Sequence, residues 1–407
     1  KKVLPKKKAP VAAAKTVAKT APFVLPPIDG KGWLFLKDFK FQALVIVIVG
    51  VLFYANTYRN QYALDDDIIM KKNMYVQKGF AGLWDVVSND AYKSYYESMG
   101  VDQQLSGGRY RPLSVITFAI EQSVFGKCYG QNYLDARDSL TEIRQKRVND
   151  DRAKNSVALQ QDDQLINQLI HEQNALDKKI NDTNMDIAST RHAMQVFWFV
   201  LSMVVLLYLF REHFFRSNTD IAFLTVLLFT IHPIHTEVVA NVKSRDEIFS
   251  LLFISLTFIF FFRYDLKKKR KDIIWGMICF WLAFLSKEYA IALVVLIPAG
   301  LMIFHKRKLS SMLWMVWPVI GVLAAYAICR FGSVGLANAP VDDSKQDILN
   351  DPYLIANSEQ RLASKLNRLD DYIQLLVYPW PLVSDYSYAH FPYSRLTDGM
   401  VWLSVAI

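Results

Sequence analysis

Three consecutive carboxylates, Asp65, Asp66 and Asp67, follow directly after the first hydrophobic stretch of the chain, Phe39 to Thr57. Like charges on neighbouring residues repel, so such a triplet persists only where water, cations or a substrate offset the repulsion. Charges are also excluded from lipid, which places the triplet in water just beyond a membrane. A carboxylate there can act as a base, and the spacing of Asp65 and Asp67 also allows a divalent cation. The alternative is a solvated, charged exit from a helix.

The elements that position this triplet are predicted to be membrane helices. Apolar residues make up 52% of the 407 residues and occur in long runs, which is typical of an all-α polytopic membrane protein. Spans are predicted at 39–57, 193–210, 221–231, 248–262, 273–285, 290–304 and 312–329, and a further one opens near Met400. The first span lies behind a polar tail and lacks a small-residue cleavage site, so we expect it to remain as an anchor. We also expect both ends of the chain to be cut, because it starts without Met and stops in an apolar run.

Basic residues predict the orientation of these spans. Lysine and arginine gather in the N-terminal tail, in 211–216, in 263–271 and in 305–308, which the positive-inside rule places in the cytoplasm. The remaining loops are then external. Five polar segments meet at that external face: 65–67, 232–237, 241–247, 286–288 and 384–386. Each alone is also explained as an interfacial anchor or a satisfied buried group, but charges from five segments on one face indicate a site.

The chain divides into seven predicted segments. They are a basic flexible cytoplasmic tail (1–38), a first transmembrane helix (39–58), an external loop with a surface helix (59–130), a coiled-coil helical hairpin (131–191), transmembrane helices two to seven (192–329), a second external loop (330–398) and the start of a further transmembrane helix (399–407). The hairpin prediction rests on Leu159, Ile166, Ile180 and Ile187, which are spaced by sevens in a stretch without Gly or Pro. We expect the hairpin to serve in docking a protein partner or in shaping the protein, since no catalytic group of residues lies on it.

Several classes of function are disfavoured by composition. The tail carries ten lysines against two aspartates in residues 1 to 40, but no aromatic-rich basic fold accompanies it, so we predict contact with anionic lipid and not with nucleic acid. The three cysteines, Cys128, Cys279 and Cys329, show no metal-binding spacing. We therefore expect no metal cofactor, apart from the divalent cation that the aspartate spacing allows.

Five motifs, in order, resemble one known family. They are DDDIIMKKN, GGRYRPLSVITF, HPIHTEVVANVKSRDEIFSLLF, LSKEYAIALVVLIP and YPWPLVSDYSY. Together they resemble the transmembrane and tetratricopeptide-repeat O-mannosyltransferases and their bacterial relatives. The chain departs from that family by inserting the hairpin, by reading His192-Ala193-Met194-Gln195 after it, and by showing no tetratricopeptide repeats before Ile407.

The resemblance implies a C-type (GT-C) fold and an enzyme. Such an enzyme transfers a sugar from a polyprenyl phosphate in the bilayer to a Ser or Thr hydroxyl of an acceptor protein at the external face, by a single displacement with inversion. The implied localisation is a bacterial inner membrane with the catalytic face toward the periplasm. Two alternatives stay open: a non-catalytic scaffold that docks through the hairpin, and a transferase of the same fold acting on glycolipid or polysaccharide.

The resemblance also assigns roles to residues. It implies Asp65 as the base and Asp66 as a partner that orients the acceptor or tunes the pKa. Arg109, Arg111, Arg245 and Lys287 are the candidates to hold the donor phosphate, since guanidinium groups suit bidentate contact and ammonium groups act as point charges. Supporting roles fall to His232, His235, Glu237, Glu288, Asp385 and Tyr386. The two histidines and Glu237 bind phosphate or organise the helix break at Pro233; they are less suited to metal, because this spacing around a proline is not a standard chelating pair.

Overall fold

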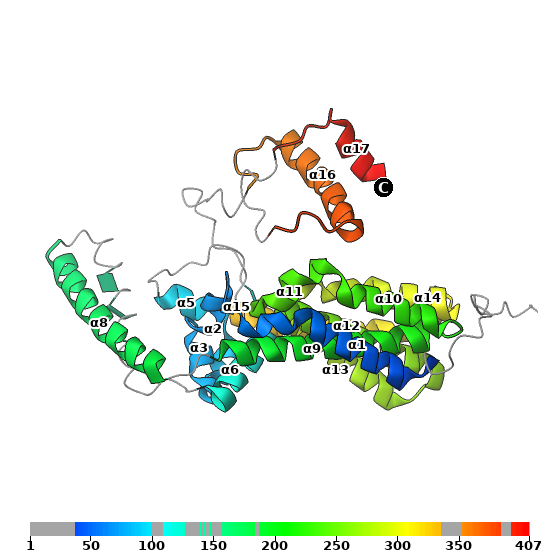
Figure 1. Cartoon of the computed structure of the whole chain (residues 1–407), viewed down its shortest axis with the longest axis horizontal. Coiled ribbons are helices and arrows are strands. Elements are labelled where there is room, and N and C mark those ends of the chain that lie inside the picture. The colour runs from blue at the N-terminus through cyan, green and yellow to red at the C-terminus, as the bar shows by residue number, and fades with distance from the viewer. Residues whose placement is uncertain are drawn as a thin grey trace, which may run out of the picture.

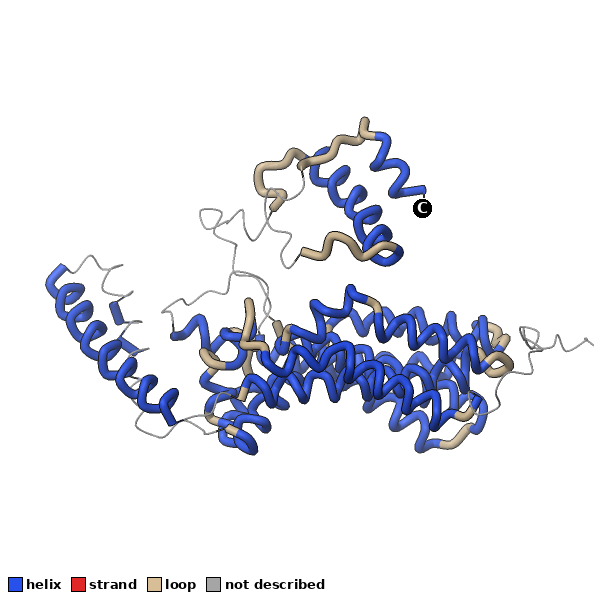
Figure 2. The backbone as a smooth tube through the Cα atoms, viewed as in Figure 1, coloured by secondary structure: helices blue, strands red, loops and turns tan. Residues whose placement is uncertain are grey.

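The computed structural model describes residues 37–98, 109–126, 156–183, 187–334, 352–383 and 392–406, with residues 139, 142–143 and 146–147 in addition. Within these ranges every regular element is a helix, as the all-α prediction requires (Figure 2). The long helices of the central bundle are α1 (Phe39–Tyr54), α9 (Ala188–Leu209), α10 (Thr219–Ile231), α12 (Arg245–Lys267), α13 (Arg270–Ser286), α14 (Leu293–His305) and α15 (Val316–Val334). Short helical turns extend or join them: η2 (Ala55–Arg59), η4 (Phe210–Phe214), η5 (Pro233–His235), α11 (Thr236–Ala240), η6 (Val242–Ser244), η7 (Glu288–Ala292) and η8 (Leu309–Met315).

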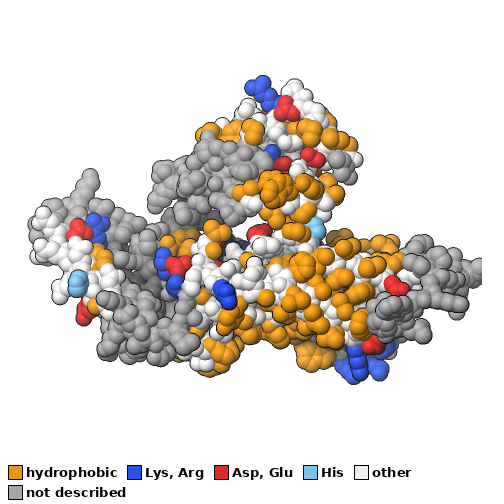
Figure 3. Space-filling model, viewed as in Figure 1, with side chains coloured by type: hydrophobic (Ala, Val, Ile, Leu, Met, Phe, Trp, Pro, Cys, Tyr) orange, Lys and Arg blue, Asp and Glu red, His pale blue; other side chains and the backbone are white. Residues whose placement is uncertain are grey.

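Helix α12 packs against both α9 and α13 within the bundle (Figure 1). Its Phe261 and Phe262 are fully buried in one apolar cluster with α13, α14 and α15, and its Ile248 and Ile259 are buried in a second cluster with α1 and α9. The outer faces stay apolar, as on α1, where Leu44, Ile48 and Leu52 are exposed. A helix that is hydrophobic all round suits a lipid environment. Figure 3 shows hydrophobic side chains over the bundle, with charged ones toward its ends.

Most of the predicted spans correspond to helices that could cross a membrane. Among the described residues, five helical segments are long and apolar enough to cross a membrane: Phe39–Arg59, Ala188–Phe214, Val242–Lys267, Glu288–His305 and Leu309–Val334. A sixth is counted if Thr219–Ile231 and Pro233–Ala240, bent by 51°, form one broken span. The bend has a local cause, because Pro233 makes the preceding His232 adopt an extended backbone and α10 ends there. Helix α13, predicted as a span, has 17 residues and is not among the five.

A cap of short helices covers one end of the bundle. It consists of α2 (Asp66–Met70), α3 (Met74–Gln77), η3 (Gly79–Gly82), α4 (Leu83–Ser88), α5 (Lys93–Ser98) and α6 (Pro112–Phe125). Their shared core includes Met70, Val76 and Phe118, and Val242 from the bundle is buried with them. We predicted a surface helix at α6. It packs against α9, α12 and α13 along one face, while Val124 and Phe125 on its other face are exposed.

Two further parts lie beside the bundle in Figure 1. Helix α8 (Ser156–Thr183) belongs to the predicted hairpin, and Lys146 Nζ contacts Asp162 Oδ1 at 2.9 Å from the preceding segment; most of that first half lies outside the described residues. Helices α16 (Ser358–Val377) and α17 (Gly399–Ala406) pack on each other. Helix α16 begins with a capping box between Asn357 and Gln360. The predicted tail, apart from Lys37 and Asp38, lies outside the described residues.

Candidate active site

Asp65 lies at the mouth of the cap, where three segments meet. Its Oδ2 accepts a hydrogen bond from the Tyr92 hydroxyl at 3.0 Å and lies 3.5 Å from Lys243 Nζ and 3.9 Å from Arg109 Nη1. The side chain remains 41% exposed, so water or a substrate can reach it. Leu64, directly before it, has a φ of 52° and is exposed. A non-glycine residue in that region carries strain that the surrounding contacts must hold in place.

Asp66 points the other way. It is fully buried and accepts backbone N–H bonds from Ala63 at 3.2 Å, Val242 at 3.4 Å and Lys243 at 2.7 Å. Burial raises the pKa of this carboxyl, and the three N–H donors oppose that rise. The predicted role of Asp66 in orienting an acceptor does not fit a side chain with no exposed surface. Its contacts instead make it a positioning residue that joins the Asp65 loop to turn η6.

Asp67 is the most weakly held of the three. Its carboxylate is 39% exposed and pairs with Lys71 at 3.8 Å and Lys72 at 3.3 Å. Exposed pairs of this kind contribute about 0–1 kcal/mol to stability. The three aspartates therefore lie in three different environments. At each position a different set of donors or cations offsets the repulsion between the neighbouring carboxylates.

The predicted cations differ in how far they are neutralised. Arg111 Nη1 contacts Asp246 at 2.8 Å, and its Nη2 contacts Glu288 at 3.2 Å. Arg330 also donates to Glu288 at 3.2 Å, and Lys287 donates to Glu247, which accepts from the Tyr289 hydroxyl as well. The three cations of this cluster are thus matched by three carboxylates. A phosphate would have to compete with those carboxylates for Arg111 and Lys287.

This cluster adjoins the Asp65 site. Burial lowers the pKa of Lys287, and the positive charges of Arg111 and Lys243 lower it further, while Asp246 raises it. The two groups are also joined by the chain: Arg109 and Lys243, which lie beside Asp65, are two and three residues from Arg111 and Asp246 of this cluster. The structure therefore brings the segments around residues 65, 109, 243 and 287 to one end of the bundle.

Arg245 is a different case, because it is fully buried between helices. Its Nε bonds Gln195 at 3.1 Å, its Nη1 bonds Thr117 at 3.0 Å and Glu121, and its Nη2 bonds the Arg191 carbonyl at 3.2 Å. Such a side chain has no face left for phosphate, so that assignment is not supported. Sequence patterns missed its partner Arg191, which is 1% exposed and bonds Tyr62 and Gln122, both at 2.8 Å. Glu121 lies between the two guanidinium groups.

The histidine motif organises the helix break. His232 Nδ1 accepts from the backbone N–H of Ile234 at 3.3 Å, and its Nε2 lies 3.0 Å from the Leu376 carbonyl of α16. The His235 ring packs on Phe229 with the ring centres 4.3 Å apart, and Glu237 is exposed. These contacts favour the structural reading of the motif. Asp385 and Tyr386 lie outside the described residues. Among the residues that the structure describes, no group of three or more His, Cys, Asp or Glu side chains is arranged to hold a metal.

Sequence reasoning overlooked three members of the site: Tyr92, Lys243 and Arg330. Lys243 stands inside the motif that contains Arg245, and Tyr92 belongs to the loop 59–130, which was predicted to be external. Their position in or near the motifs was the sequence signal that could have identified them. Which of two basic neighbours faces Asp65, Lys243 or Arg245, depends on the packing of α6, α9 and α12.

Comparison with known proteins points in the same direction as the motifs. Residues 186–330 match the model of the dolichyl-phosphate-mannose-protein mannosyltransferase family. The Protein O-mannosyl-transferase TMTC1 of Homo sapiens and that of Mus musculus are each 38% identical to this chain over 68 residues, 17% of its length. The matched region spans 8% and 7% of those two relatives. No solved structure matches the chain. The chain is therefore similar, over residues 186–330, to the dolichyl-phosphate-mannose-protein mannosyltransferase family, which confirms the resemblance that its motifs predicted.

Proposed function

We propose that this protein is a GT-C-type membrane glycosyltransferase that moves a sugar from a polyprenyl phosphate to a Ser or Thr hydroxyl of an acceptor protein. The single observation that carries the proposal is the environment of Asp65. A half-exposed carboxylate, held by Tyr92, stands between Lys243 and Arg109 at one end of a bundle of apolar helices. An anionic base beside cations suits a reaction between a hydroxyl and a sugar phosphate.

The reaction needs one base and cations for the leaving phosphate. Asp65 accepts the proton of the acceptor hydroxyl while that oxygen forms a bond to the anomeric carbon of the sugar. The bond from that carbon to the phosphate oxygen breaks on the opposite face, so the configuration inverts and the phosphate leaves with the electron pair. Phosphate is a good leaving group, so no general acid is required.

Arg109 and Lys243 are the cations best placed to face that phosphate. Their side chains are 43% and 25% exposed, and the only carboxylate that pairs with either of them among the described residues is Asp65 itself. Arg109 also lies over the Tyr92 ring, with its guanidinium carbon 4.7 Å from the ring centre, which fixes its direction. Arg111 and Lys287 stand behind them as a second group of cations. We propose that the reaction takes place at the external face of the membrane. In a bacterial inner membrane this is the periplasmic face.

Substitution of the first aspartate tests the proposal. Asp65→Asn keeps size but removes basicity, so turnover should fall on the order of 10²-fold or more while binding of the lipid donor stays nearly unchanged. Asp67→Asn is the matched control, because it removes an equal charge two residues away and should have the smallest effect. Transfer of radiolabelled sugar from a polyprenyl phosphate to protein is the measurement.

The other readings give different patterns. Full activity of Asp65→Asn would end the catalytic assignment and leave the scaffold function. A charge-only role predicts similar small effects at Asp65 and Asp67 that added salt reproduces. A metal site predicts that both substitutions fail together and that a chelator inactivates the unmodified protein. Label that appears in lipid or polysaccharide, with none in protein, would transfer the activity to another acceptor.

A further inference from the structure

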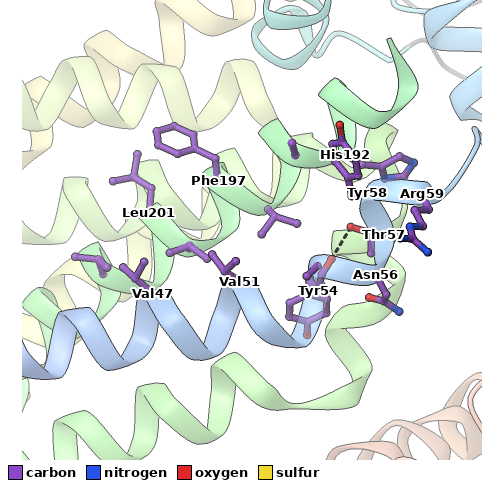
Figure 4. Close-up of a pocket in the computed structure, with 15 residues that line it drawn as sticks. Val47, Val51, Tyr54, Asn56, Thr57, Tyr58, Arg59, His192, Phe197 and Leu201 are labelled. Carbon is purple, nitrogen blue, oxygen red and sulfur yellow. Dashed lines mark hydrogen bonds between the residues drawn. The ribbon is translucent and has the colours of Figure 1, made fainter. Parts of the chain in front are cut away.

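A groove runs between α1 and α9 on the outside of the bundle, with a volume of about 910 Å³ (Figure 4). Its walls are apolar along most of its length, with Val47 and Val51 on α1 and Phe197 and Leu201 on α9. Val51 and Phe197 are 44% and 53% exposed. Both helices are membrane-span candidates, so hydrocarbon is the medium that this groove meets.

The groove has a floor, because the two helices touch beneath it. Gly50 is buried, and a Cβ atom there would lie 2.9 Å from Val200 Cγ2. At roughly 30 Å³ for each non-hydrogen atom, its volume corresponds to about 30 atoms. That is the size of the acyl chains of one lipid molecule.

The groove changes character at one end. Asn56, Thr57 and Arg59 of η2 line it there, together with His192 at the start of α9 (Figure 4). Arg59 is exposed, and no ion pair or hydrogen bond holds its guanidinium among the residues described. An uncompensated arginine just beyond an apolar span is placed to meet the phosphate of a lipid headgroup.

We infer that this groove binds one anionic phospholipid, with its acyl chains between α1 and α9 and its phosphate on Arg59. This site is separate from the one around Asp65. The Asp65 carboxylate contacts Tyr92, Arg109 and Lys243, and Arg59 is not among its partners. The two sites are nevertheless adjacent in the chain: His192 Nε2 lies 3.4 Å from the Gln61 carbonyl, at the start of the loop that carries Asp65.

Lipid retention by the purified full chain tests this inference. The protein is exchanged into detergent with equal amounts of phosphatidylglycerol and phosphatidylcholine, and retained lipids are counted by native mass spectrometry. We expect phosphatidylglycerol to be preferred, Arg59→Gln to reduce that preference at least about fivefold, and Val51→Trp to reduce retention of both lipids. Lys269→Gln, at an exposed cation that precedes α13, and Leu228→Trp, at an exposed apolar position on α10, should retain lipid as the unmodified protein does.

Three results would overturn the inference. One is an unchanged preference for phosphatidylglycerol in Arg59→Gln; Arg59 is exposed and can be replaced without a folding penalty, so this variant decides even if Val51→Trp is unstable. Another is equal retention of the two phospholipids by the unmodified protein. The last is displacement of phosphatidylglycerol by an equal concentration of polyprenyl phosphate, which would show that the groove binds the glycosyl donor.

Discussion

The backbone N–H of Lys243 donates a hydrogen bond of 2.7 Å to the buried carboxylate of Asp66, and the ammonium of the same lysine lies 3.5 Å from Asp65. One residue of the η6 turn thus contacts both aspartates, with its main chain and its side chain. Arg245, two residues later, is locked between Glu121 and Gln195. The turn is held from two sides, and this is what keeps a cation beside the exposed carboxylate.

Replacement of Asp66 should act through this coupling. Asp66→Asn puts an amide where one oxygen accepted N–H bonds, so at least one buried donor is left unpaired, at a cost of about 1–3 kcal/mol. Transfer should fall less than in Asp65→Asn, since the base is intact but Lys243 is displaced. Thermal unfolding followed by tryptophan fluorescence, together with the transfer assay, measures both effects. Normal stability with lost activity would contradict a positioning role.

The same carboxyl predicts a pH dependence. Because burial raises the folded-state pKa of Asp66 above its unfolded value near 3.9, the folded protein binds this proton more tightly than the unfolded chain does. Its contribution to stability is therefore complete below that unfolded value and is lost as the pH rises through the folded pKa. The stability difference between the unmodified protein and Asp66→Asn should shrink over that rise. A difference that is constant from pH 3 to pH 7 would show that the pKa is not raised.

The buried pair of arginines gives an ordering of two variants. Glu121→Gln leaves both Arg191 and Arg245 without a carboxylate, whereas Arg245→Met leaves the Arg191 and Glu121 pair in place. Breaking a buried pair costs about 3–5 kcal/mol, so Glu121→Gln should be the more destabilising of the two. Melting temperatures in detergent measure the order. The reverse order would mean that Arg245 is held mainly by its neutral partners.

Lys287 remains a predicted phosphate ligand. Lys287→Ala should weaken donor binding, and Lys287→Arg should keep only part of that binding. The planar guanidinium of arginine does not reproduce the compact charge of the lysine ammonium. Glu247→Gln is the matched control, since it removes the carboxylate that Lys287 contacts and leaves the ammonium free for phosphate. Donor affinity that is unchanged in Lys287→Ala would remove this residue from the site and leave its ion pair as a structural contact.

The orientation of the hairpin can be checked by labelling. The lysine distribution predicts that residues 131–191 are external, so a cysteine at Ser156, the first residue of α8, should react with a membrane-impermeant maleimide from outside. The three native cysteines are first replaced to give a silent background. Reaction from the cytoplasmic side alone would reverse the topology and move the Asp65 site with it.

The sequence by itself determined the membrane helices and the family resemblance. Long apolar runs predict α1, α9, α12, α14 and α15 because only a hydrocarbon environment or a large core accepts them, and motif order carries the resemblance. Charge at residues 65 to 67 also predicted a polar cluster at the end of the first span.

Only the tertiary structure decided which of these charges is available for chemistry. Asp65 and Asp66 are identical in type and adjacent in sequence, yet one is exposed and the other is buried under η6. Arg245 and Lys243 divide in the same way, since Glu121 on α6 and Gln195 on α9 enclose the first and leave the second at the mouth. Burial depends on the neighbours that other helices bring, and those neighbours are distant in sequence. A local pattern therefore indicates that a charged residue is present, while packing decides whether it faces substrate or stabilises the fold.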